Sequence, residues 1–209
     1  MTSSRKGVQI NPQTIARVTG VLFFAATISY GVGNMLIASA LEAPDGLLNP
    51  NNTQIGIGVL LEFINSAAVI GIGVLLFPVL RRYSEGMALG YAGSRIIESV
   101  LLVVGALSAL LLLTLRWHDL TFQIAMIALG AGSLLLCYIL YTAKLVPRAI
   151  SVLGFVGYIA LFVYGLSEIL GLNIGLVLFI PGGIFEIVFP LWLIIKGFND
   201  PAVTAQSVK

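Results

Sequence analysis

The sequence predicts an all-α fold, a polytopic integral membrane protein built as a bundle of six transmembrane helices. Two observations lead to this class. Hydrophobic residues make up 58% of the 209-residue chain and only 10% of residues are charged, which is too apolar for a soluble domain of this size. The apolar residues also gather into long runs, and a helix that crosses a bilayer needs about 20 of them in succession.

Six runs are long enough to be spans, and the connections between them are short. They cover residues 18–40, 56–80, 87–115, 120–143, 149–170 and 174–197. Residues 18–197 therefore form a single transmembrane domain between two short cytoplasmic tails, 1–17 and 198–209. The third run is longer than a bilayer requires, so we expect it to tilt or to extend past the interface.

The basic residues predict the orientation of these spans, because loops rich in Lys and Arg stay in the cytoplasm. With six spans, nearly all of them fall on the side of the two termini: Arg5, Lys6, Arg17, Arg81, Arg82, Lys144, Arg148, Lys196 and Lys209. The opposite side carries only Arg116, with Glu42 and Asp45 in the first loop. Both termini are thus predicted to be cytoplasmic. The net charge of +2 reflects this topology, and we infer no nucleic-acid partner from it.

Residues that hold cofactors are scarce. Cys137 is the only cysteine, and His118 is the only histidine, placed by the sequence in an outer turn beside Trp117 and Asp119. One cysteine and one histidine do not supply the ligands of a zinc site or a haem. No span has a lysine at its centre, and no nucleotide-binding or hydrolase motif is present. We therefore expect no cofactor, no metal and no catalytic residues.

Five ionisable residues nevertheless lie inside the spans: Glu62, Arg95, Glu98, Glu168 and Glu186. A charge near the centre of a bilayer costs roughly 2.5–3.5 kcal/mol even on lenient scales, so such residues usually face the bundle interior. Arg95 and Glu98 are three residues apart and share a helical face, which allows an ion pair between them. Glu62 and Asn65 form a second polar face in the second span.

Glu186 follows Pro181, Gly182 and Gly183 by about one turn. Proline removes a backbone donor and glycine loosens the backbone, so the sixth span is expected to be either broken or simply kinked at this point. Broken helices are places where membrane proteins expose polar backbone groups to ligands.

The depth of the glutamates within their predicted spans favours a common site. Glu62, Glu98 and Glu186 lie at comparable levels, so with Arg95 they are the main candidates for binding a ligand or a proton. Asn34, Asn65 and Glu168 are peripheral candidates. The set would line a cavity that opens outward. Burial and like charge disfavour ionisation, so at least one glutamate is expected to be protonated near neutral pH. A proton or cation site follows, and a purely structural network that fixes helix register is the alternative.

Several segments also resemble a known family. They are residues 16–22, 75–82, Ser94 to Glu98, Phe185–Glu186 and 191–198. They are similar to a bacterial multi-pass membrane family known only as domain of unknown function 4386, from about Thr14 to Phe198. The resemblance implies a six-span protein of the bacterial cytoplasmic membrane. It implies no activity and no functional residues.

Three functions are therefore open. The first is a small transporter or permease-like bundle with a buried carboxylate-lined site for protons or a small polar or cationic ligand. The second is a non-catalytic sensor, chaperone or partner subunit whose buried charges are structural. The third is a lipid-modifying membrane enzyme, for which Glu168 and His118 are the only candidates at headgroup level. The lipid bilayer is the expected environment, and a homo-oligomer remains open.

Overall fold

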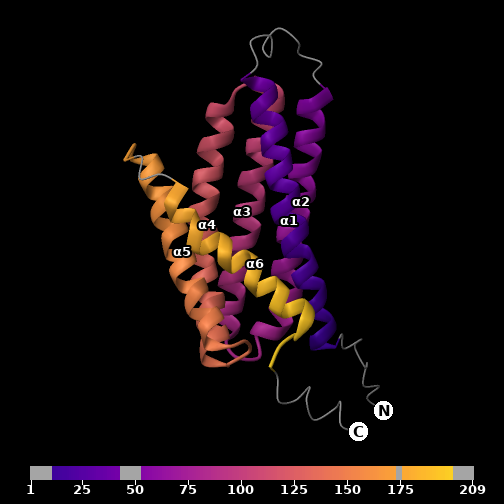
Figure 1. Ribbon diagram of the computed structural model, residues 1–209, viewed down its shortest axis with the longest axis vertical. Coiled ribbons are helices and arrows are strands. Elements are labelled where there is room, and N and C mark those ends of the chain that lie inside the picture. Colours follow the sequence, from indigo (N-terminus) through magenta and orange to yellow (C-terminus); the bar gives the residue numbers. More distant parts are fainter. Residues whose placement is uncertain (1–10, 43–52, 173–175, 200–209) are drawn as a thin grey trace, which may run out of the picture.

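The computed structural model describes residues 11–42, 53–172 and 176–199, and within them the chain is entirely helical (Figure 1). Six α-helices follow one another: α1 (Pro12–Leu41), α2 (Thr53–Leu80), α3 (Glu85–Leu112), α4 (Leu115–Thr142), α5 (Arg148–Ile169) and α6 (Phe179–Ile195), with a 3₁₀ turn at Leu176–Leu178 before α6. The predicted all-α six-helix bundle is confirmed. The first five helices are long and apolar enough to cross a membrane.

The helices form a closed ring. Each helix packs against the next along the chain, and α6 returns to pack between α5 and α1. Gln13 at the start of α1 donates a hydrogen bond from Nε2 to the carbonyl of Phe198, just beyond α6, at 2.9 Å. We call this end of the bundle, where α1 begins and α6 ends, the terminal end, and the opposite end the distal end.

The last helix differs from the others. With 17 residues, α6 is shorter than the five candidate spans, and it runs diagonally across the face of the bundle in Figure 1, in yellow, from α5 towards the start of α1. The sequence predicted a sixth span over 174–197 with a break or a kink at Pro181. Both expectations at Pro181 are wrong, because this proline lies in the first turn of α6, where its missing N–H would have no helical partner anyway.

The sequence also misplaced the boundary between the third and fourth helices. α3 ends at Leu112 instead of 115, and Leu113 takes a left-handed conformation with φ 49°. Thr114 then caps α4, its hydroxyl accepting a hydrogen bond from the N–H of Arg116 at 3.3 Å. The segment around His118, expected in an outer turn, is therefore the first turn of α4.

The basic residues occupy the ends that the sequence assigned to them. Arg81, Arg82, Lys144, Arg148 and Lys196 lie at the terminal end, and Arg116 lies at the distal end. Arg5, Lys6, Asp45 and Lys209 are outside the described residues, as are most of the two predicted tails.

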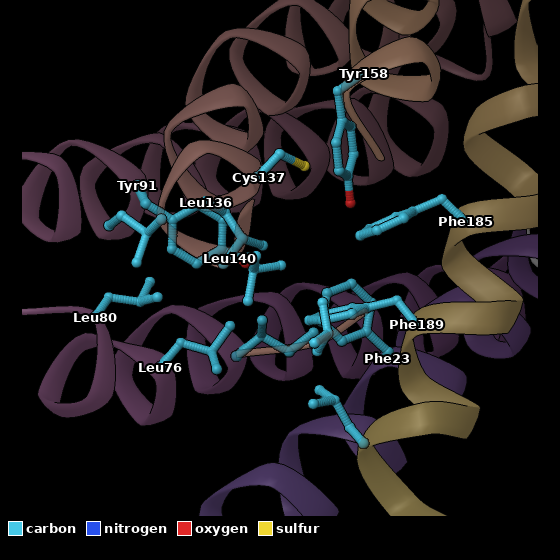
Figure 2. Packing of buried hydrophobic residues seen from close by; sticks show 14 of the residues in the cluster. Phe23, Leu76, Leu80, Tyr91, Leu136, Cys137, Leu140, Tyr158, Phe185 and Phe189 are labelled. Carbon is cyan, nitrogen blue, oxygen red and sulfur yellow. The ribbon is translucent and has the colours of Figure 1, made fainter. Parts of the chain in front are cut away.

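Large buried side chains pack together inside the ring (Figure 2), and most of the labelled ones come from its terminal half. Phe185 and Phe189 of α6 stack on each other with centroids 4.9 Å apart, and Phe23 of α1 meets Phe189 edge-on at 5.5 Å. Tyr91 and Tyr158 are fully buried in the same cluster.

Candidate ligand cavity in the helix ring

A cavity of about 300 Å³ lies inside the ring, distal to the aromatic cluster. All six helices contribute to its wall, which consists of Phe23, Ala26, Thr27, Tyr30, Gly31, Asn65, Val69, Ile72, Arg95, Glu98, Leu102, Phe122, Met126, Leu129, Leu161, Phe179, Gly182, Gly183 and Glu186. Its size is at the lower end of the range typical of small-molecule sites, and its wall is mostly apolar with a few polar groups, as such sites usually are.

Arg95 and Glu98 of α3 form a buried ion pair on the wall of this cavity. Nη1 of Arg95 donates to Oε2 of Glu98 at 2.9 Å, and both residues are only 3% exposed. Nε of Arg95 donates to the hydroxyl of Tyr91 at 3.0 Å. The guanidinium also lies 5.3 Å from the ring of Tyr91 and 5.5 Å from that of Phe23. The expected pair is present, and aromatic rings flank it.

One donor of this guanidinium is unused. Nη2 of Arg95 is buried and has no hydrogen-bond partner in the described part of the chain. An unsatisfied buried donor on a charged group is costly. Since Arg95 lines the cavity, Nη2 is available to an acceptor on a bound molecule.

Glu186 enters the same cavity from α6. It is half-buried, and among the described residues its carboxylate makes no hydrogen bond and no ion pair. The charge of Glu98 is already balanced by Arg95. With all three groups ionised, the cavity therefore carries one negative charge in excess, and that charge belongs to Glu186.

Three aromatic rings also line the cavity. Phe122 of α4 stacks between Tyr30 of α1, at 5.1 Å, and Phe179 of α6, at 6.1 Å. These three rings come from helices that are far apart in the sequence. Because the rings stack on one another, the faces of Phe122 are covered by its two neighbours, and together the three rings offer apolar surface to the cavity.

The cavity opens at the side of the bundle, between α1 and α6. Three of its lining residues are exposed: Thr27 and Gly31 on α1, and Gly183 on α6. Towards the terminal end the two helices are in close contact, since a Cβ added to Gly20 would lie 2.7 Å from the carbonyl of Pro190. From there α6 diverges towards α5, as its diagonal course in Figure 1 shows. The opening thus lies within the apolar span of α1.

Glu62 does not line this cavity but forms a separate buried pair. Nε2 of His118 lies 2.9 Å and 3.1 Å from the two carboxylate oxygens of Glu62, and both residues are buried. The pair joins α2 to α4. The sequence analysis missed it because His118 was assigned to a solvated turn. Two features of the sequence could have indicated this pair. Thr114 is a suitable cap for a helix that includes His118, and Glu62 is a carboxylate within a span that needs a partner.

The peripheral candidates also differ in whether they line the cavity. Asn65 lies on the cavity wall, whereas Asn34 and Glu168 are half-buried and do not line it. His118 bonds to Glu62, and no hydrogen bond joins it to Glu168 within the described residues. In the same part of the chain, no three His, Cys, Asp or Glu side chains are grouped as a metal site requires.

A family model described as a domain of unknown function (DUF4386) matches residues 18–119 and 109–197. No curated protein and no solved structure shows significant similarity to the chain.

Proposed function

Because the chain belongs to the DUF4386 family, which has no assigned function, we propose a function from its cavity: a small transporter or permease-like membrane protein that binds its ligand inside the helix ring. The observation that carries this proposal is that all six helices contribute to one cavity, and that three ionisable side chains line it. Buried charges in a membrane bundle are costly and usually mark ligand or ion pathways. The expected location is the bacterial cytoplasmic membrane.

The polar groups support a binding role over a purely structural one. A network that only fixes helix register is satisfied internally, as the bond between Arg95 and Glu98 is. Nη2 of Arg95 and the carboxylate of Glu186 are instead left without partners among the described residues, on the wall of one cavity. A ligand or a proton would satisfy them.

A transport assay with a cavity variant tests the proposal. Proteoliposomes are loaded with a pH-sensitive dye, and small alkylammonium ions, carboxylates and neutral amides are added in turn under a pH gradient. At least one class is expected to change the dye signal. Gly183→Leu should abolish that response, because Gly183 lines the cavity and a Cβ there meets no atom within 4 Å, so the larger side chain is accommodated.

Gly93→Leu is the matched control. Gly93 is a half-buried helical glycine whose Cβ would likewise meet nothing within 4 Å, but it does not line the cavity. It should behave as the unaltered protein does. If no class produces a response, while Glu98→Gln and Glu186→Gln only lower the melting temperature, the charges are structural and the protein is a non-catalytic sensor or partner subunit.

A further inference from the structure

We propose that the ligand of this cavity is a small lipophilic organic cation, such as a protonated amine on an apolar or aromatic body, which enters from the bilayer between α1 and α6. This inference rests on the proposed function and specifies its ligand. Three independent features of the cavity carry it: its charge, its aromatic wall and the position of its opening.

The charge of the cavity selects the sign of the ligand. Arg95 is engaged by Glu98 at 2.9 Å and by the hydroxyl of Tyr91 at 3.0 Å, so its positive charge is already matched. The carboxylate of Glu186 has no such partner in the described residues. An anion in this space would meet two carboxylates, whereas a cation next to Glu186 brings the excess charge to zero. Removing both charges from water is favourable only when they are paired in this way.

The free Nη2 of Arg95 is compatible with the same ligand. It needs an acceptor, and a neutral oxygen such as a hydroxyl or an ether supplies one without adding charge. Arg95 itself cannot turn freely to bind an anion. Its guanidinium lies against the rings of Phe23 and Tyr91. The base of its side chain packs against Gly73, where an added Cβ would lie 3.1 Å from the Cβ of Arg95.

The aromatic residues of the wall favour a ligand whose uncharged part is apolar. Tyr30, Phe122 and Phe179 present apolar surface within the same small space as Glu186. These rings provide contact for the apolar substituents of a bound molecule, and the carboxylate of Glu186 in the same cavity provides the opposite charge for a cation. A volume of about 300 Å³ limits the ligand to a small molecule.

The position of the opening indicates the route by which a ligand enters the cavity. Thr27, Gly31 and Gly183 form its exposed rim, on the side of the bundle, next to exposed apolar residues of the same helices such as Ile28 and Ile180. A side opening at this level faces lipid in a membrane-spanning bundle. Molecules that partition into the bilayer are concentrated there, so a lipophilic cation reaches Glu186 through this opening.

A binding measurement with matched probes tests this assignment. The protein is reconstituted in lipid nanodiscs and titrated with radiolabelled benzyltrimethylammonium. Two further probes are each titrated in radiolabelled form and also tested, unlabelled, as competitors of the cation: neopentylbenzene, which has the same shape with carbon in place of the charged nitrogen, and 4-phenylbutanoate, which is an anion. We expect saturable binding of the cation and displacement by neither competitor.

Variants identify the residue responsible. Glu186→Gln should raise the Kd for the cation by on the order of thirtyfold or more, as the loss of a desolvated charge pair does. Glu168→Gln, the same change at a glutamate that does not line the cavity, should leave the Kd unchanged. Gly31→Leu and Gly183→Leu at the rim should reduce binding, and Gly93→Leu should not. Gel filtration of each variant verifies that the fold is retained.

The outcomes separate the ligand class from the function. Equal Kd values for the unaltered protein and Glu186→Gln would overturn the assignment. Saturable binding of the neutral or the anionic probe, lost in Gly183→Leu, would also overturn it but would keep the cavity as a ligand site. Absence of saturable binding for all three probes would overturn both proposals.

Discussion

At the scale of single residues, partners explain where the charges of this chain lie. Arg95 bonds to Glu98, and Glu62 bonds to His118, so four of the buried charged or titratable side chains are in pairs. Glu186 differs, since it lies half-buried on the wall of the cavity without a partner among the described residues. Paired groups stabilise helix packing, whereas an unpaired group on a cavity wall is suited to a ligand.

The pair of Glu62 and His118 leads to a prediction about stability. Glu62→Leu or His118→Leu alone leaves the other side chain buried without its partner, which should lower the free energy of unfolding by roughly 3–5 kcal/mol. The double variant Glu62→Leu/His118→Leu removes both groups and should melt at a higher temperature than either single variant. Thermal unfolding in detergent measures this difference.

Glu168→Leu serves as the control, because the side chain of Glu168 is half-buried and makes no hydrogen bond and no ion pair in the described part of the chain. It should change the melting temperature little. If the losses of the two single variants simply add in the double variant, Glu62 and His118 are not coupled.

At the scale of helices, close approach between backbones sets the path of α6. Gly157 of α5 faces Gly182 of α6, and a Cβ at Gly157 would lie 2.7 Å from the Cα of Gly182. Small residues allow helices in membrane bundles to pack this closely. α6 is thereby held against α5 near its start and against α1 near its end, and the opening of the cavity lies between these two contacts.

Substituting alanine for glycine at two positions tests this contact between α5 and α6. Gly157→Ala should lower the free energy of unfolding by about 1–3 kcal/mol, because the contacting atoms belong to the backbone and cannot move aside. Gly93→Ala should instead stabilise by roughly 0.5–1 kcal/mol, since its Cβ meets nothing within 4 Å and alanine favours a helix. Melting temperatures that fall equally in both variants would contradict this packing.

At the scale of the whole molecule, the helices alternate in direction, and the basic residues gather at the terminal end. This distribution predicts that the terminal end lies in the cytoplasm. Cys137 is buried, so a Cys137→Ala background provides a chain without reactive thiols. Arg116→Cys and Lys144→Cys then place single exposed thiols at opposite ends of the bundle.

A membrane-impermeant maleimide applied to intact cells should label Arg116→Cys and leave Lys144→Cys unlabelled. After the cells are lysed, both variants should react. The opposite pattern in intact cells would mean that the bundle is inserted with its termini outside.

The sequence by itself determined the fold class, the number of helices, the ends at which the basic residues lie, and the pair of Arg95 and Glu98, because these depend on apolar run length and on spacing within one helix. Tertiary structure decided which helices meet. It joined His118 to Glu62, brought Tyr30, Phe122 and Phe179 together, and placed Glu186 on the wall of the same cavity. Periodicity within a helix carries no information about its partner across the ring, so neither these contacts nor the opening beside α6 could be predicted from the sequence.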